Sequence, residues 1–396
     1  MKFTHILLLS VLSCVGLTAS AQVKPKPSSS PAPTTSPDIF QSVLKTKTTK
    51  VSGISPQTQK ELDYSAQLMK TGKCKESIDV NTKVIKSNPR IMLAYNNRGY
   101  CYMQLKQFDL AIADFNTALK ISPSSLPYIN RGMSFYQKGD TAGAIADTTK
   151  ALQLNPKEGM AYNNRGYFYT QNGEFDKAIA DLDKAISISP KDASYLTNRC
   201  YAYYKMGTLE KALADCNSAI AGTQKLAVTY GNRGAIYLQI ADFKAALADI
   251  DAALKLDNSI SDFHANRGFA LANLNLFQEA IESYTKSIEL KPMATVYIKR
   301  AEAYSKLKKT DLELNDYTKA IELDPGNPVL YNNRGIFFLN NNQKSDALND
   351  FNKAIELNPK LSILYKNRAY VYELLGETEK AAADKKTAET LETTGN

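Results

Sequence analysis

A repeat of 33 or 34 residues constrains this chain more strongly than any other feature. Its clearest copy runs from Tyr95 to Pro123 and reads YNNRGYCYMQLKQFDLAIADFNTALKISP. At that step one position returns as glycine, at Gly99, Gly132, Gly166, Gly234, Gly268 and Gly335. A second position returns as alanine, at Ala118, Ala151, Ala185, Ala219, Ala253, Ala320, Ala354 and Ala388. A period of this length predicts a solenoid, in which each repeat packs against its neighbours.

Each repeat contains two apolar stripes at helical spacing. In the clearest copy Tyr95, Gly99 and Tyr102 are four and three residues apart, and the second half repeats that spacing with alanines around Phe115. Glycines lie between the stripes, where a tight turn is needed, at Gly139, Gly173, Gly207 and Gly376. Prolines follow the second stripe, at Pro123, Pro156, Pro190, Pro292, Pro325 and Pro359. The pattern predicts two helices per repeat, joined by a turn and ended before each proline.

This order of aromatic, glycine, tyrosine, alanine, aromatic, alanine and proline resembles the tetratricopeptide repeat (TPR). The resemblance covers nearly everything after residue 57, and its Asn-Arg-Gly repeats are similar to those of exported bacterial members. It implies an all-α solenoid of about ten helix-turn-helix units that form a right-handed superhelix. Over residues 58–395 we expect repeats that begin near residues 58, 92, 125, 159, 193, 227, 261, 294, 328 and 362.

The beginning of the chain predicts export. An apolar run from Ile6 to Leu17 follows a lysine and precedes the small residues 19–21, which is typical of a secretory signal peptide over residues 1–21. We therefore expect a periplasmic or secreted protein. A lipoprotein anchored at Cys14 is the alternative, because the preceding residues loosely resemble a lipobox.

Residues 22–57 are rich in proline, serine, threonine and lysine, which predicts a flexible linker. The net charge of +9 belongs to this end of the chain. Residues 22–91 carry 12 Lys and Arg against 5 Asp and Glu, whereas residues 92–396 carry 36 against 35. The basic segment either contacts envelope polyanions peripherally or is a solvated linker. A charge-balanced array in an exported protein argues against a nucleic-acid partner, and no later apolar run is long enough for a transmembrane helix.

The residues give little support to catalysis. Of two histidines, His5 belongs to the signal peptide, and His264 stands where other repeats have tyrosine, so we interpret it as a packing residue. No His/Cys cluster has metal-ligand spacing, and no glycine loop suits a phosphate, so we expect no metal and no cofactor.

Arginine and aspartate repeat together, which predicts a ladder of ion pairs within or between repeats. Arginine holds one position of the first helix, at Arg98, Arg131, Arg165, Arg199, Arg233, Arg267, Arg300, Arg334 and Arg368. Aspartate holds one position of the second, at Asp114, Asp147, Asp181, Asp215, Asp249, Asp316, Asp350 and Asp384.

Asparagine precedes nearly every such arginine, at Asn97, Asn130, Asn164, Asn198, Asn232, Asn266, Asn333 and Asn367, with Lys299 as the exception. The resemblance implies that this position faces a concave groove, together with Tyr100, Tyr136, Tyr167, Tyr201, Tyr204 and Tyr370. These residues are the candidate peptide-binding site. The groove lacks the lysines of carboxylate-clamp TPR domains and is more similar to the asparagine ladder of eukaryotic O-linked N-acetylglucosamine transferase. Two interpretations stay open, because the amides could bind a peptide backbone or the neighbouring repeat.

Some positions depart from the pattern. Glu313 replaces an alanine at the tight helix crossing of the eighth repeat, which predicts a loosened repeat. Cys200 and Cys216 take the glycine and aromatic positions of the fifth repeat, and we expect them to face each other about one helical turn out of register. A bridge needs Cα atoms within about 7 Å, so the sequence leaves open both this pair and Cys74–Cys101.

We expect a non-enzymatic interaction scaffold of the bacterial cell envelope that binds an extended peptide segment or partner protein in its groove. Stacked tyrosines and amides also suit sugars, so a glycan or peptidoglycan binder is one alternative. A targeting subunit of a separate envelope enzyme is another.

Overall fold

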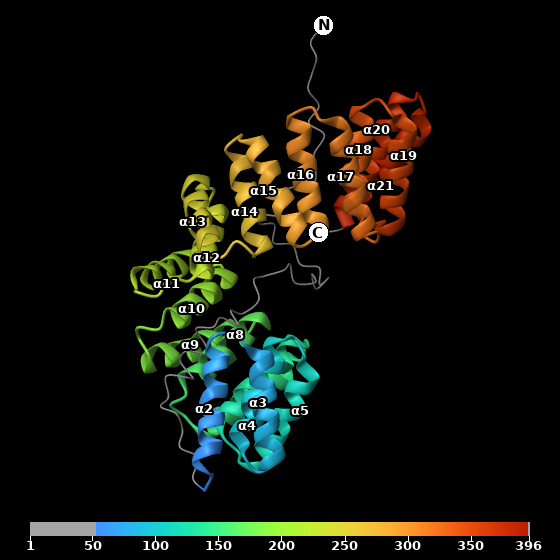
Figure 1. The fold of residues 1–396 in the computed structure, drawn as a ribbon. Helices are drawn as coiled ribbons and strands as arrows, with labels where there is room; N and C mark the ends of the chain where they lie inside the picture. The colour runs from blue at the N-terminus through green and yellow to red at the C-terminus, as the bar shows by residue number, and fades with distance from the viewer. Residues whose placement is uncertain (1–52, 395–396) are drawn as a thin grey trace. The chain divides into compact units, whose positions relative to one another are not determined.

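The computed structural model describes residues 53–394, and every regular element in that range is a helix. The expected signal peptide, the Cys14 anchor and most of the expected linker lie outside the described residues. Within residues 53–394 the twenty helices form ten hairpins, one per repeat, each with a first helix (A) and a second helix (B) (Figure 1). The all-α, helix-turn-helix fold class is therefore confirmed.

The A helices are α2 (Pro56–Lys70), α4 (Met92–Gln104), α6 (Ser125–Gln137), α8 (Gly159–Gln171), α10 (Ala193–Met206), α12 (Ala227–Gln239), α14 (Ser261–Asn273), α16 (Ala294–Lys306), α18 (Pro328–Asn340) and α20 (Ser362–Leu374). The B helices are α3 (Cys74–Ser87), α5 (Phe108–Ile121), α7 (Thr141–Leu154), α9 (Phe175–Ile188), α11 (Leu209–Ala221), α13 (Phe243–Leu256), α15 (Phe277–Leu290), α17 (Thr310–Leu323), α19 (Lys344–Leu357) and α21 (Thr378–Thr394).

The turn inside each hairpin requires one residue in the left-handed backbone region. The predicted turn glycines adopt it, with φ of 88° at Gly139 and 86° at Gly207. In other repeats a residue with a side chain takes the same conformation, namely Lys106, Ala241, Asn275, Lys308 and Asn342. Such residues pay a steric cost that glycine avoids, so the hairpin imposes the turn even where the sequence lacks the favoured residue.

Helices A and B of one repeat meet at the small residues that the repeat supplies. A Cβ atom added to Gly99 would lie 2.9 Å from Cε1 of Phe115, and one added to Gly335 would lie 2.8 Å from Cε1 of Phe351. The alanines of helix B, such as Ala111 and Ala118, are fully buried. The recurring spacing of small and aromatic residues thus produces a close crossing of the two helices, in which an aromatic ring packs on the backbone at the glycine.

The chain divides into two compact units. The N-terminal unit comprises the described residues up to Ile236, and the C-terminal unit begins at Tyr237. B helices pack against the A helix of the next repeat, as α5 does on α6 and α15 on α16. Within a unit consecutive A helices also touch, as α8 does with α10 and α14 with α16.

The first repeat replaces the small and aromatic core by polar groups. Ser65, Ser77 and Asn81 are fully buried, and Asn81 Nδ2 donates to Ser65 Oγ at 2.6 Å while the two serine hydroxyls are 2.9 Å apart. A repeat with a neighbour on one side needs less apolar packing. None of the helices described over residues 53–394 is long and apolar enough to cross a membrane.

Candidate binding surface on the A helices

Seven arginines of the A helices form bidentate ion pairs with the aspartate sixteen residues later, on helix B of the same repeat. In the second repeat Arg98 Nε and NH2 donate to Asp114 at 2.8 and 2.7 Å. The same geometry recurs in Arg131–Asp147, Arg165–Asp181, Arg199–Asp215, Arg300–Asp316, Arg334–Asp350 and Arg368–Asp384. The predicted ladder of ion pairs is confirmed, and its main bonds lie within each repeat.

The third guanidinium nitrogen, NH1, reaches the B helix of the preceding repeat. Arg98 NH1 donates to Thr82 Oγ1 at 3.2 Å, and in later repeats the acceptors are Asn116, Thr149, Asp183, Asn217, Thr285, Thr318 and Asn352. The guanidinium of Arg98 also lies between the rings of Tyr95 and Tyr102, at 5.7 and 5.9 Å from their centroids. Such a group has few donors left for a ligand, so the arginine row holds the repeats in register.

The seventh repeat breaks this ladder. Ser283 stands where the other repeats have aspartate, and Arg267 donates from NH1 to its hydroxyl at 2.9 Å. Its Nε instead bonds Asp251 in the preceding repeat at 2.7 Å. Both side chains of this pair are more exposed than those of the bidentate pairs, at 32% and 40%. The seventh rung is therefore shifted toward the surface.

The asparagine row follows a simple register rule. The side chain donates to the residue directly before the corresponding row position of the preceding repeat, when that residue is also asparagine. Asn130 Nδ2 lies 3.1 Å from Asn96 Oδ1, and the same bond joins Asn198 to Asn163 and Asn367 to Asn332 at 2.8 Å. These three amides link consecutive A helices. The partners Asn96, Asn163 and Asn332 were not among the predicted site residues. Each of them directly precedes a member of the asparagine row in the sequence.

Two members of the row face isoleucine at the partner position and are left open. For Asn164 that residue is Ile129, and for Asn333 it is Ile298. The Nδ2 atom of Asn164 and both amide atoms of Asn333 are buried without a hydrogen-bond partner. Asn97 and Asn232 are also buried, while Asn266 is half-buried. Asn164 Oδ1 accepts from Asn163 Nδ2 at 3.3 Å. The row therefore contains closed rungs, which hold the fold, and open rungs, in which at least one buried amide atom has no partner.

The predicted tyrosines lie on the same helices and divide into buried and partly exposed members. Tyr167 and Tyr201 are buried and stack with their ring centroids 6.3 Å apart, and Tyr136 meets the edge of Tyr167 at 5.7 Å. Tyr100, Tyr136, Tyr204 and Tyr370 are half-buried and present part of their rings to solvent. Burial raises the pKa of Tyr136 and Tyr204, so both hydroxyls stay protonated. The N-terminal unit thus carries a continuous tyrosine cluster over α4, α6, α8 and α10.

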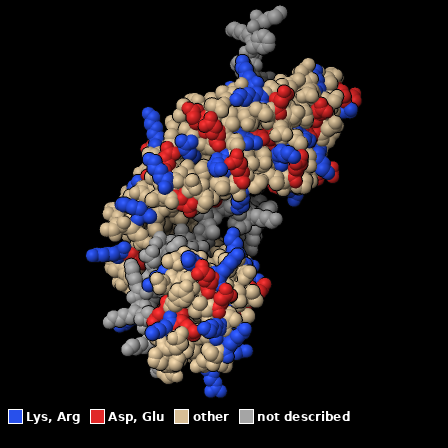
Figure 2. Space-filling model, in the orientation of Figure 1, with Lys and Arg blue, Asp and Glu red and all other residues tan. Residues whose placement is uncertain are grey.

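In the C-terminal unit the eighth repeat places charges at the same positions. Lys299 replaces the asparagine and Glu302 replaces the aromatic residue, and Lys299 Nζ lies 3.1 Å from Glu302 Oε2. The ammonium is also 5.9 Å from the centroid of Phe269 on α14. Elsewhere on the face in view, acidic and basic side chains are interspersed (Figure 2).

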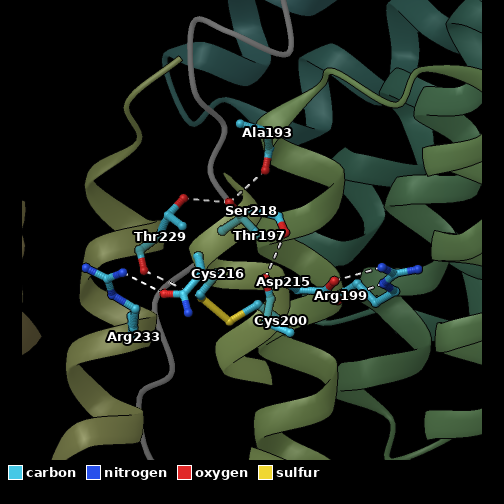
Figure 3. The surroundings of a disulfide bond; sticks show 11 residues. Ala193, Thr197, Arg199, Cys200, Asp215, Cys216, Ser218, Thr229 and Arg233 are labelled. Carbon is cyan, nitrogen blue, oxygen red and sulfur yellow. Dashed lines mark hydrogen bonds and ion pairs between the residues drawn. A yellow bond between two sulfur atoms is a disulfide. The ribbon is translucent and has the colours of Figure 1, made fainter. Parts of the chain in front are cut away.

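A disulfide bond joins Cys200 and Cys216 across the hairpin of the fifth repeat (Figure 3). Their Cα atoms are 5.5 Å apart, so the expected offset of one helical turn is wrong. The other repeats explain why, since Gly99 meets Phe115 at the same two positions. Arg199 and Asp215 pair beside the bridge, each next to one cysteine.

Cys74 and Cys101 are free thiols, buried between the first and second repeats. The hydrogen bond between them lowers the pKa of Cys74 and raises that of Cys101. His264 is half-buried, with Nε2 3.0 Å from the Asn258 carbonyl oxygen. Among the side chains of the described range, no group of His, Cys, Asp and Glu could hold a metal ion.

Sequence profiles of the tetratricopeptide repeat match residues 93–125, 127–158, 148–180, 166–207, 232–295, 294–327, 316–349 and 351–383. The chain belongs to the tetratricopeptide repeat family. TPR solenoids are typically protein–protein interaction scaffolds and generally lack catalytic activity.

Two curated relatives resemble short parts of this TPR protein. The mouse sperm-associated antigen 1 is 37% identical over 71 residues, which is 18% of this chain and 8% of that protein. The rat protein of the same name is 45% identical over 51 residues, or 13% of this chain and 6% of its own length. The matches thus span less than a tenth of either relative.

Solved structures share the fold at low sequence identity. The APC/C hetero-tetramer Cut9–Hcn1 aligns with 85% of this chain and 67% of the matched chain, at a TM-score of 0.57 and 14% identity. A monomeric mutant of IFIT1 with Gppp-AAAA aligns with 90% of this chain and 94% of its own, at a TM-score of 0.54 and 14% identity. Identity at this level shows a shared fold and no shared ligand.

Proposed function

We propose that this TPR protein is a non-enzymatic scaffold of the bacterial cell envelope that binds an extended segment of a partner protein along its A helices. The observation that carries the proposal is that different residues of those helices hold the repeats together and face solvent. The arginines bond internal partners, whereas half-buried tyrosines present part of their surface to solvent and buried amide atoms of Asn164 and Asn333 have no partner. Amides bond the C=O and N–H groups of an extended chain whatever its side chains are.

The envelope location rests on two independent features. The first is the signal-peptide pattern of residues 1–21. The second is the Cys200–Cys216 disulfide, because disulfides persist mainly in exported proteins. Mass spectrometry of the mature protein tests the location, with an N-terminus at Gln22 as the expected result. A lipid-modified Cys14 would favour the membrane-anchored alternative.

Binding can be tested by site-specific photo-crosslinking in cells of the source organism. A photoreactive phenylalanine analogue at the half-buried Tyr204 is compared with the same residue at Leu110, which is exposed on a B helix. We expect a discrete protein adduct at Tyr204 that is absent at Leu110. Equal labelling at both positions would refute a binding surface on the A helices.

A glycan-binding function is the second candidate, because the half-buried rings of Tyr100, Tyr136 and Tyr204 also suit the faces of sugars. Purified peptidoglycan strands separate the two candidates. Saturable binding to strands that carry no protein would support the glycan function, whereas the scaffold function predicts none. A targeting subunit would instead co-purify with the activity of its enzyme.

A further inference from the structure

Four departures from the repeat pattern lie close together in sequence, in repeats seven and eight of the C-terminal unit. They are Ser283 in place of aspartate, Lys299 in place of asparagine, Glu302 in place of an aromatic residue, and Glu313 in place of alanine. Two of them remove an interaction that the other repeats have. Ser283 costs Arg267 its bidentate partner, and Glu313 places a carboxyl group at a helix crossing, with only 9% of its surface exposed. Local rules that fail without a gain in packing are expected at functional sites.

The geometry around Lys299 is that of an occupied cation site. Its ammonium lies 3.1 Å from Glu302 Oε2 and 5.9 Å from the centre of the Phe269 ring. A carboxylate and an aromatic face are the two groups that together favour a cation. Both members of the ion pair are about one-third exposed, at 31% and 36%. Pairs this exposed are weak, so the lysine can be displaced by a better cation from solution.

Further groups around this site supply negative charge and open hydrogen-bonding capacity. Burial raises the pKa of Tyr317, and the negative charges of Glu313 and Glu302 raise it further, so both carboxyl groups lie in the neighbourhood of this residue. On α18, Asn333 is 5% exposed and both of its amide atoms are unpartnered. The register of the closed rungs directs this amide toward Ile298, the residue beside Lys299.

We propose that repeats seven and eight recognise a basic side chain of an extended peptide, with its cation between Glu302 and Phe269 in the place of Lys299. Arginine fits better than lysine, because a guanidinium is planar and can stack on the ring while it bonds the carboxylate. This inference rests on the proposed scaffold function, since it names the class of peptide that one part of the surface takes.

The test uses the mature chain and a seven-residue peptide of alanine, serine and threonine with one central arginine. The control peptide carries citrulline, which is neutral and nearly the same shape. Binding is followed by NMR titration and calorimetry. We expect the arginine peptide to bind at least tenfold more tightly than the citrulline peptide. Equal binding of the two peptides, or no binding of either, would overturn the inference.

Two variants are expected to change the arginine-peptide affinity in opposite directions. Glu302→Gln removes the charge that holds the cation and should weaken binding about tenfold. Lys299→Ala removes the competing ammonium and should strengthen it several-fold. If Lys299→Ala weakens binding, or if a peptide with central glutamate binds more tightly than the arginine peptide, the site recognises anions and the inference is wrong.

Control variants separate this site from the rest of the surface. Asn333→Ala removes a buried amide that the peptide does not reach, so it should leave the affinity for both peptides unchanged. Glu322→Gln, which alters an exposed pair with Lys319 on α17, should change neither. The photo-crosslink at Tyr204 lies in the N-terminal unit and tests the scaffold function separately. A retained crosslink with no arginine preference would refute the arginine site and leave the scaffold function standing.

Discussion

The two units present different chemistry at corresponding positions of their A helices. In the N-terminal unit the row consists of asparagines and tyrosines, with Tyr136, Tyr167 and Tyr201 in mutual contact. In the eighth repeat the same positions hold Lys299 and Glu302. Yet Arg300 and Asp316, next to these substitutions, form a bidentate pair like that of the second repeat. Different residues therefore set the register of the repeats and the chemistry of the surface, so that either can change alone.

The largest expected effect comes from the device that both units share. Arg165→Ala in the N-terminal unit and Arg300→Ala in the C-terminal unit each leave a buried aspartate without a partner, which should cost roughly 3–5 kcal/mol of unfolding free energy. Arg267→Ala breaks a pair that is far more exposed, so its cost should be about 0–1 kcal/mol. Urea unfolding followed by circular dichroism measures all three. Similar losses in all three variants would show that the seventh rung is equivalent to the others.

The disulfide should distinguish the units next. Its cysteines are 16 residues apart in sequence, and closing a loop of that size stabilises by about 3 kcal/mol. Because repeats contact only their neighbours, reduction should increase hydrogen exchange in α10 and α11 and leave α18 to α21 unchanged. Mass spectrometry with and without reductant checks this. Uniform destabilisation of both units would contradict the local character of the bridge.

Glu313 lowers the stability of the C-terminal unit at a position where repeats two to five of the N-terminal unit have a buried, neutral alanine. These alanines are Ala111, Ala144, Ala178 and Ala212. Burial raises the pKa of the Glu313 carboxyl group, so the folded state favours the protonated form. Stability is therefore lost as the pH rises from the unfolded pKa through the higher folded pKa. Glu313→Ala should be more stable than the parent by roughly 1–2 kcal/mol above that window, and the difference should shrink in acid.

Thermal unfolding from pH 4 to pH 8 measures this difference. The matched control is Ala347→Glu, which puts a carboxyl group at the same crossing in the ninth repeat. It should destabilise with the same pH dependence. A Glu313→Ala advantage that does not vary with pH would show that packing, and not ionisation, is responsible.

The smallest effects concern single amides and can be compared within each unit. Asn198→Ala and Asn367→Ala remove closed rungs, and each should cost about 0.5–1.5 kcal/mol. Asn164→Ala and Asn333→Ala remove open rungs and should leave the unfolding free energy almost unchanged. Differential scanning calorimetry of the four variants decides the matter. Equal losses from open and closed rungs would mean that the bonds between amides contribute nothing to the fold.

The fold could be predicted from the sequence because its signals recur in phase. The step between Gly99 and Gly132 defines the repeat, and the Arg98–Asp114 spacing of sixteen residues already joins two facing helices. The disulfide could also have been predicted, because the glycine and aromatic positions face each other across the hairpin, as Gly99 and Phe115 do. Counting helical turns along the sequence gave an offset between the two cysteines, because it does not include how the two helices close on each other.

The state of the asparagine row could not be derived from the row itself. Whether Asn130 or Asn164 is satisfied depends on a residue one repeat earlier, Asn96 or Ile129, on a different helix. That relation requires the distance between consecutive A helices, which no spacing within one repeat encodes. The candidate peptide-binding residues stay predictions, and the structure divides them into groups that experiment can treat separately.

The reach of each arginine to the preceding B helix gives the array a direction. NH1 bonds backward along the chain in every arginine of the row except Arg267, which does so through Nε, and the three closed amide rungs have the same direction. A repeat that emerges during synthesis or translocation therefore finds its docking partners already made in the repeat before it. Assembly can proceed from the amino end as an ordered zipper, in which each new hairpin completes its bonds without waiting for the next one.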